Sequence, residues 1–226
     1  MSPWRRRLES ERLATRRPLV LIFGEDENDR KALRELMTAL CPRLEGCVET
    51  RRQPLVLIKN ARPSDLRDRA QRIADVVARE RLVRNVLCVF AHEDCDAVEP
   101  AHEAVAQKIE QALAVAGCAA HAVAPAWEME AWWFLWPAAV TACNPSWSVP
   151  ARFRGTEVGR IVEAKEEFQR ATVAHRGSRG ARRYRPSDSP LIAEKVRELG
   201  IARSPAAISR SYDSFVAKVE ECCSTL

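Results

Sequence analysis

Residues 86 to 96 of the chain read Val86-Leu87-Cys88-Val89-Phe90-Ala91-His92-Glu93-Asp94-Cys95-Asp96. An apolar run ends here in a group of acidic side chains. A strand that is buried on both faces of a parallel sheet has such an unbroken apolar run. In open α/β sheets, ligands bind beyond the carboxyl ends of the strands. The stretch therefore predicts a buried parallel strand whose end presents Asp94 and Asp96 to a site.

Asp94 and Asp96 are separated by one residue. On an extended chain, side chains two positions apart point the same way, with Cα atoms roughly 7 Å apart. The two carboxylates can therefore converge on one cation. Aspartate is also a good N-cap, so on this stretch alone a second interpretation stays open, in which both residues only cap the following helix.

The flanking sequence repeats the alternation of strand and helix. Further strands are predicted at Pro18–Phe23, Pro54–Lys59 and Cys118–Ala124, with an irregular connection over 41–53. Apolar residues at helical spacing predict helices at Lys31–Leu40, Ser64–Leu82 (with Ser64 as N-cap) and Glu99–Ala116. This alternation is typical of βαβ units. We predict an α/β fold with a mainly parallel sheet of about four strands flanked by helices.

Three parts follow from the composition along the chain. Residues 1–17 form an arginine-rich arm, residues 18–150 hold the α/β domain, and residues 151–226 form a helical extension. Helices in the extension are predicted at about 157–173, 189–199 and 204–222. Its basic loop, residues 170–185, has no acidic residue.

The overall composition is that of a globular protein with one sizeable core. The 226 residues carry a formal net charge of +5, which mildly favours a polyanionic partner. The chain has no apolar run long enough for a membrane helix and no segment that resembles a secretory signal. The eight cysteines include no CxxC pair, which argues against structural zinc. We predict a cytoplasmic protein without membrane association, with reduced cysteines.

Two other stretches carry acidic candidates. The first strand runs into Gly24-Glu25-Asp26-Glu27-Asn28-Asp29, which holds more acidic side chains than helix capping needs. The tryptophan-rich stretch 125–136 contains Glu128 and Glu130. Positions i and i+2 of a helix do not share a face, so we expect at most one of these two glutamates to enter a common site. Most of the tryptophans are expected to serve packing.

The basic loop supplies candidates for nucleic-acid binding, namely Arg176, Arg179, Arg182, Arg183 and Arg185. Arginines in a loop suit contacts to phosphate, and Tyr184 could stack on a base. The alternative is a loop that is simply solvated.

Residues 18–136 resemble the TOPRIM domain of topoisomerases, primases and OLD-type nucleases. Glu25 to Asp29 take the place of its glutamate turn, and Ala91 to Asp96 take the place of its Asp-x-Asp segment. Glu130-Ala131-Trp132, Tyr184 and Ser214-Phe215 are similar to motifs of small TOPRIM-like proteins often encoded beside ATPases. Asp26 departs from the pattern, which has glycine there; glycine permits close approach of the backbone.

The resemblance implies a metal-dependent nuclease acting on DNA or RNA, as the effector of a bacterial anti-phage defence or toxin module with an ATPase partner. Its metal ligands would be Glu25, Asp94 and Asp96, and Glu130 would be a further catalytic residue. Additional candidates are Asp29, His92, Glu93 and Glu128. Clustered carboxylates take up protons unless a cation neutralises them, and oxygen ligands suit Mg²⁺ or Mn²⁺.

Other functions stay open at this stage. A non-catalytic TOPRIM-like interaction module would contact a partner protein through the acidic cluster and the tryptophan-rich helix, so that substitution of Trp132 or Trp133 would break the complex. A small phosphatase is a third candidate, and homo-oligomerisation is compatible with each of the three. The chain has no P-loop of the G-x-x-x-x-G-K-[ST] type, so any ATP dependence would come from another chain.

Overall fold

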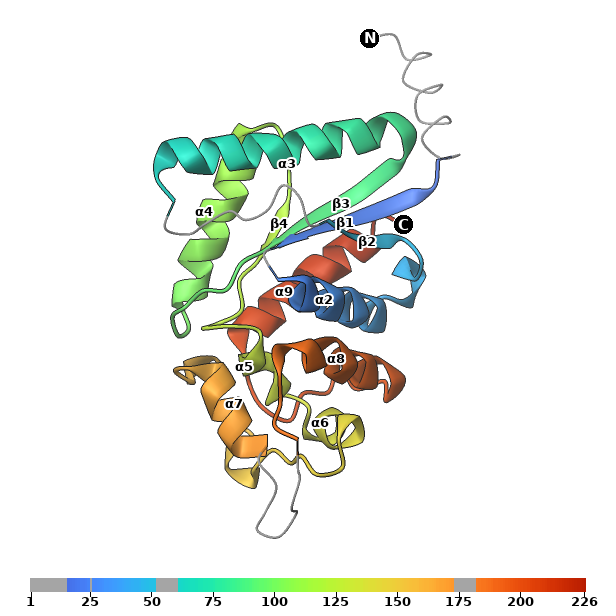
Figure 1. The fold of residues 1–226 in the computed structure, drawn as a ribbon. Helices are drawn as coiled ribbons and strands as arrows, with labels where there is room; N and C mark the ends of the chain where they lie inside the picture. The colour runs from blue at the N-terminus through green and yellow to red at the C-terminus, as the bar shows by residue number, and fades with distance from the viewer. Residues whose placement is uncertain (1–15, 25, 52–60, 173–181) are drawn as a thin grey trace.

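One parallel sheet organises the protein (Figure 1). The structure is a computed structural model that describes residues 16–24, 26–51, 61–172 and 182–226. The four strands are β1 (Pro18–Gly24), β2 (Val48–Arg51), β3 (Asn85–His92) and β4 (His121–Val123). Their order is β2-β1-β3-β4, and every pair is parallel. The predicted α/β fold, with about four parallel strands flanked by helices, is confirmed.

Among the described residues, helices follow and separate these strands. The α-helices are α2 (Glu27–Leu40), α3 (Pro63–Val83), α4 (Ala101–Val115), α5 (Glu130–Trp133), α6 (Pro137–Cys143), α7 (Ala164–Thr172), α8 (Ser189–Glu198) and α9 (Arg210–Cys223). Short 3₁₀ helices are η1 (Pro42–Leu44), η2 (Ala151–Phe153), η3 (Val158–Arg160) and η4 (Pro186–Asp188). In the described part of the chain, no helix has both the length and the apolar character needed to cross a membrane.

The sheet is covered on both faces, as its apolar strands require. Leu19, Leu21 and Phe23 of β1 belong to a core shared with α3 and α4. Val20 and Ile22 belong to a second core, which α2, α8 and α9 complete. Figure 1 shows α3 on one side of the sheet, with α2 and α9 on the other.

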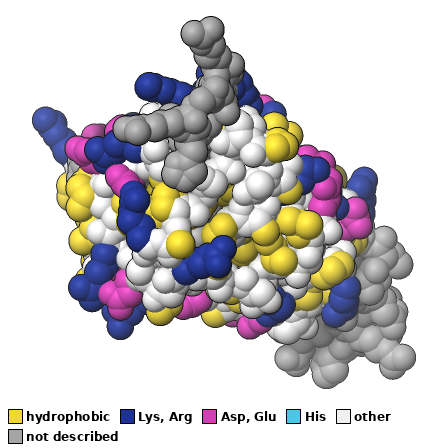
Figure 2. Space-filling model, turned by 90° about the horizontal axis from the view of Figure 1, so that it is seen from below, with side chains coloured by type: hydrophobic (Ala, Val, Ile, Leu, Met, Phe, Trp, Pro, Cys, Tyr) yellow, Lys and Arg dark blue, Asp and Glu magenta, His cyan; other side chains and the backbone are white. Residues whose placement is uncertain are grey.

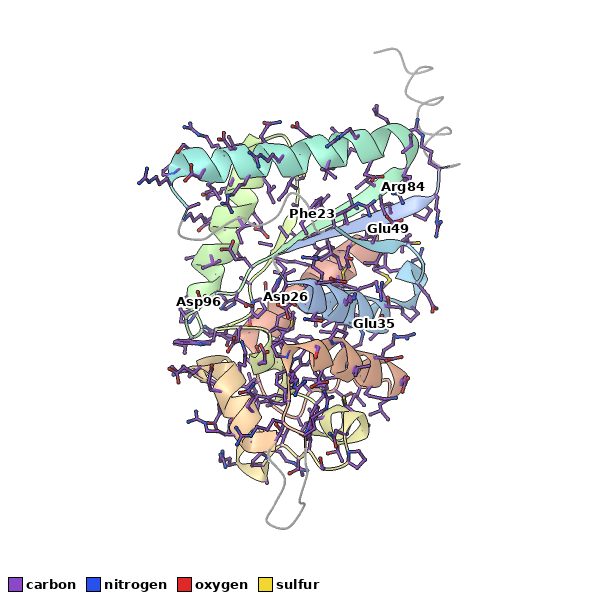
Figure 3. All side chains as sticks on the ribbon, viewed as in Figure 1. Phe23, Asp26, Glu35, Glu49, Arg84 and Asp96 are labelled. Carbon is purple, nitrogen blue, oxygen red and sulfur yellow. A yellow bond between two sulfur atoms is a disulfide. The ribbon has the colours of Figure 1, made fainter. Side chains whose placement is uncertain are left out.

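The second strand is not where the sequence predicted it. β2 lies within the stretch that was predicted to be irregular, and the predicted strand at 54–59 lies outside the described residues. β2 has no apolar run because, among the described strands, it lies at the edge of the sheet and pairs only with β1. Its Glu49 and Arg51 instead form ion pairs with Arg84 and Glu80 (Figure 3 labels Glu49 and Arg84). A strand that is stabilised by backbone pairing and by ion pairs cannot be recognised from an apolar run in the sequence.

Several helix boundaries also differ from the predictions, because capping decides them. α2 begins earlier than predicted, since the Asp26 carboxylate accepts hydrogen bonds from the backbone N of Asn28 (2.6 Å) and Asp29 (3.4 Å). Ser64 lies inside α3 rather than capping it. The helix predicted from residue 204 begins only after Ser209, whose Oγ accepts from the backbone N of Tyr212.

The C-terminal helices pack against the same core as the sheet. The ring of Phe215 on α9 lies 6.5 Å from Phe90 of β3 and 5.3 Å from Trp132. Trp132 also makes an edge contact with Tyr212. Residues 151–226 therefore help to bury one face of the sheet.

One disulfide joins Cys41, at the end of α2, to Cys223, at the end of α9. The expectation that the cysteines are reduced is wrong for this pair; the other six cysteines are free. The two residues are 182 positions apart, so no local spacing could reveal the bond.

Removing this disulfide is expected to destabilise the protein. A Cys41→Ser/Cys223→Ser variant should lose about 2–4 kcal/mol of unfolding free energy, because the crosslink restricts the unfolded chain. Urea unfolding of the oxidised protein measures the difference. Cys47→Ser/Cys143→Ser, which removes two half-buried free thiols, is the control and should change stability much less. Equal stability of the two double variants would contradict the prediction.

Candidate metal site

An acidic pocket of about 260 Å³ lies beyond the carboxyl ends of β1 and β3. Its lining residues come from the starts of α2 and α7, the end of β3, the entry to α5, and η4. They are Asp26, Asp29, His92, Asp94, Glu128, Glu130, Lys165 and Pro186.

Strand pairing explains why these side chains meet. Gly24 of β1 pairs with His92 of β3, so the residues that follow both strands emerge side by side. Asp29 lies in the first turn of α2, which begins directly after β1. The close approach depends on Gly24, where an added Cβ would lie 3.1 Å from Cβ of His92.

Asp29, His92 and Asp94 form the tightest group in the pocket. Each offers one ligand atom, and these three atoms lie within 4.8 Å of one another. His92 is 4% exposed, and its ring nitrogens have no hydrogen-bond partner among the described residues. Its Nε2 lies 3.5 Å from Oδ1 of Asp94, which is too far for a good hydrogen bond. Burying an imidazole without a hydrogen bond costs folding free energy. A metal ion bound to a ring nitrogen would supply the missing partner.

The electrostatics of the pocket also favour a cation. Burial raises the pKa of Asp29 to about 7, and the neighbouring Asp94 carboxylate adds to the shift. Burial likewise raises the pKa of Glu130 to about 8, with a further contribution from Glu128. Burial alone would lower the pKa of His92, but its carboxylate neighbours, Asp94 first, raise it. A divalent ion would offset the repulsion among these carboxylates, which adds to the pKa shifts that burial causes.

Asp96 does not join this group. β3 ends at His92, and the chain turns at Asp96, which has a left-handed φ of 49°. Asp96 is exposed and lies in the loop before α4, apart from Asp26 (Figure 3). Asp94 lines the pocket and Asp96 does not, so the expectation that the two carboxylates converge on one site is wrong for this pocket. Neither residue caps α4, whose N-cap position is Pro100.

Both Glu128 and Glu130 line the pocket, so the expectation that at most one of them could do so is wrong. The helical spacing rule does not apply, because α5 begins only at Glu130 and Trp127 has a φ of 59°. Oε1 of Glu128 accepts a hydrogen bond from the backbone N of Lys165 (2.7 Å) at the start of α7.

Two further acidic candidates have other positions. Glu25 lies outside the described residues, so its role as a ligand stays a prediction. Glu93 is buried but does not line the pocket, and its backbone N donates to the carbonyl oxygen of Val123.

None of the basic candidates that the structure describes lines the acidic pocket. Arg176 and Arg179 lie outside the described residues. Arg182 pairs with Asp188 and lies 5.7 Å from the Trp147 ring, while Arg183 and Arg185 are exposed. On the face in Figure 2, basic side chains are interspersed with acidic and hydrophobic ones.

Tyr184 cannot stack on a base, because it is buried and 1% exposed. Its hydroxyl donates to Oε1 of Glu130 (2.9 Å) and lies 2.7 Å from Oγ of Ser189. The sequence-based proposal for Tyr184 is therefore wrong.

Lys165 and Pro186 belong to the pocket but were not predicted. They follow Asp94 by a long stretch of chain, and no local pattern connects them with it. Only their place at the ends of packed helical segments brings them to this edge.

Comparisons with known proteins gave no similarity to interpret: no family model, curated protein or solved structure matches this chain.

Proposed function

We propose that this chain binds a divalent cation through Asp29, His92 and Asp94 and uses it to hydrolyse phosphodiester bonds in nucleic acid. The observation that carries the proposal is His92, a buried imidazole that faces two carboxylates without a hydrogen bond to either ring nitrogen. A ligand set with open positions, inside a pocket of limited volume, suits catalysis better than a closed structural site.

The residues determine which cation fits. Carboxylates suit Mg²⁺ and Mn²⁺, whereas an imidazole ligand favours first-row transition metals. Mn²⁺ satisfies both preferences, so we place it ahead of Mg²⁺. A bound cation of this class can polarise a phosphoryl oxygen and lower the pKa of a coordinated water.

The pocket is sized for the reacting group. Its volume of about 260 Å³ lies below the range of pockets that enclose drug-sized ligands, so a phosphate with its cation fits better than a whole nucleotide. Lys165 is the basic side chain among the described lining residues. The net charge of +5 supports a polyanionic substrate, DNA or RNA. A phosphatase acting on small phosphate esters would use the same site, and assaying both substrate classes separates the two.

The TOPRIM-like motifs support a place in a defence or toxin module beside an ATPase, in the cytoplasm, where the Cys41–Cys223 disulfide would be unusual. The interaction-module alternative keeps only its acidic cluster as a contact surface, because Trp132 and Trp133 are fully buried.

Calorimetric titration with Mn²⁺ tests the site. His92→Gln should lower the affinity for Mn²⁺ at least about 100-fold, and for Mg²⁺ by less, because Mg²⁺ depends little on imidazole. The matched control is His102→Gln, which changes a histidine of equal exposure on α4 and should bind Mn²⁺ like the wild type.

Circular dichroism confirms that each variant is folded. Wild-type protein that binds no Mn²⁺, or a His92→Gln variant that binds it as tightly as His102→Gln, would refute the site. Tighter binding of Zn²⁺ in a parallel titration would change the identity of the cation but not its place.

A further inference from the structure

Four side chains near the pocket form a hydrogen-bonded chain. Nε1 of Trp133 lies 3.1 Å from Oγ of Ser189, which lies 2.7 Å from the Tyr184 hydroxyl. The hydroxyl lies 2.9 Å from Oε1 of Glu130. All four side chains are buried, and Glu130 is the one that lines the pocket.

The donors of this chain can be assigned from their chemistry. An indole Nε1–H only donates, and Ser and Tyr each have one hydroxyl proton. Burial raises the pKa of Tyr184 well above its usual value, so this side chain keeps its proton. If Tyr184 donates its one hydroxyl proton to Glu130, Ser189 must be the donor in the bond between Ser189 and Tyr184. Every proton in the chain then points toward Oε1 of Glu130.

This direction fixes where a proton on Glu130 can sit. Oε1 accepts from Tyr184, so the carboxyl proton must be on Oε2. Glu130 forms no ion pair with a lysine or arginine in the described residues, and it shares the pocket with Glu128 and Asp94. A carboxyl in such surroundings favours its neutral form. Burial is the largest cause of its raised pKa, and burial persists when a cation binds to neighbouring residues.

We propose that Glu130 is the general acid that protonates the leaving oxygen, and that Tyr184 is a positioning residue which keeps the acidic proton on Oε2, facing the pocket. The inference rests on the proposed phosphodiester hydrolysis. A water gives one proton to solvent, the resulting hydroxide attacks phosphorus, and the bond from phosphorus to the leaving oxygen breaks. That oxygen takes the proton from Oε2, and the Glu130 carboxylate regains a proton from solvent.

A change of leaving group tests this role. The two substrates are an oligonucleotide, whose sugar oxygen needs a proton to leave, and the p-nitrophenyl ester of thymidine 5′-phosphate, whose phenolate does not. With Mn²⁺ present, Glu130→Gln should lower kcat on the oligonucleotide by about 10²–10⁴-fold but lower kcat on the nitrophenyl ester far less. Tyr184→Phe should show the same selectivity with a smaller loss, since Glu130 keeps its carboxyl group.

Glu128→Gln is the matched control, because it changes the same functional group in the same pocket. It should alter cleavage of both substrates by one common factor. Mn²⁺ affinity, measured for each variant, should stay near that of the wild type for Glu130→Gln and Tyr184→Phe, since neither residue belongs to the ligand group.

The outcomes distinguish the proposed hydrolysis from the general-acid role of Glu130. Equal losses on both substrates in Glu130→Gln, or no loss on either, would overturn the general-acid role and leave the hydrolysis intact. Wild-type protein that cleaves neither substrate would overturn the proposed function and the inference with it. A Tyr184→Phe variant with equal losses on both substrates would show that Tyr184 acts only on folding.

Discussion

Asp94→Asn is expected to abolish Mn²⁺-dependent cleavage of an oligonucleotide, whereas Asp96→Asn leaves it close to the wild-type rate. The Asp94 carboxylate belongs to the group that can hold the cation, while Asp96 is exposed outside the pocket. Loss of a bound Lewis acid removes several kcal/mol of transition-state stabilisation, which corresponds to a rate decrease of about 10³-fold or more.

The two variants are well matched. Both exchange a carboxylate for an amide, and asparagine tolerates the left-handed backbone of Asp96. Removing the charge of Asp94 also removes a repulsive neighbour of Asp29 and Glu130. Asp94 also attracts His92, whose pKa it raises, so circular dichroism of Asp94→Asn must show a folded protein before its loss of activity is assigned to the site.

Thermal unfolding provides a second measurement. At a Mn²⁺ concentration about 100 times the dissociation constant, the unfolding free energy of the wild-type protein should rise by about 2.7 kcal/mol. That of Asp94→Asn should rise little. If Asp96→Asn abolishes cleavage and Asp94→Asn does not, the pocket described here is not the active site.

Gly159→Ala is expected to destabilise the protein by about 3–5 kcal/mol. A Cβ at this position would lie 2.1 Å from Cδ of Glu99. The Glu99 carboxylate accepts hydrogen bonds from Oγ of Ser209 (3.0 Å) and the backbone N of Ser211 (2.8 Å) at the start of α9. Displacing Glu99 loses these bonds, and each hydrogen bond to a charged group contributes about 1.5–3 kcal/mol.

Two controls isolate the cause of this effect. Gly200→Ala tests backbone strain alone, because Gly200 has a φ of 66° and nothing within 4 Å of an added Cβ; it should cost only about 1–2 kcal/mol. The double variant Glu99→Ala/Gly159→Ala should have nearly the same unfolding free energy as Glu99→Ala, because the carboxyl group that would clash with the new Cβ is gone. Urea unfolding measures all four variants, and fully additive effects would contradict the steric explanation.

Runs and spacings of apolar residues predicted those elements that bury an apolar face in the core. The apolar runs of β1 and β3 and the spacing in α3 and α4 were sufficient, because those residues face a core on the sheet. β2 escaped prediction because pairing and ion pairs stabilise it rather than apolar burial. In the site, His92 and Asp94 could be found from the end of the strand, but the turn at Asp96 depends on contacts such as its backbone N bonding to the Trp127 carbonyl oxygen (2.8 Å).

The rest of the site depends on tertiary packing. Tyr184 is far from Glu130 in sequence, and its role became visible only when helical packing buried both side chains. The same holds for Lys165, whose position follows from the Glu128 carboxylate at the start of α7. Residues of this kind carry no periodicity and no characteristic spacing.

The two faces of the sheet are completed at different times as the chain is synthesised. α3 and α4 lie between the strands in sequence, so one face is covered as soon as β4 has left the ribosome. The other face must wait for α8 and α9, which emerge last among the described elements. Until then Val20, Ile22 and Phe90 have no complete cover, and such exposed apolar surface promotes aggregation of nascent chains. The nascent protein thus passes through a stage at which chaperone binding would protect one specific side of its sheet.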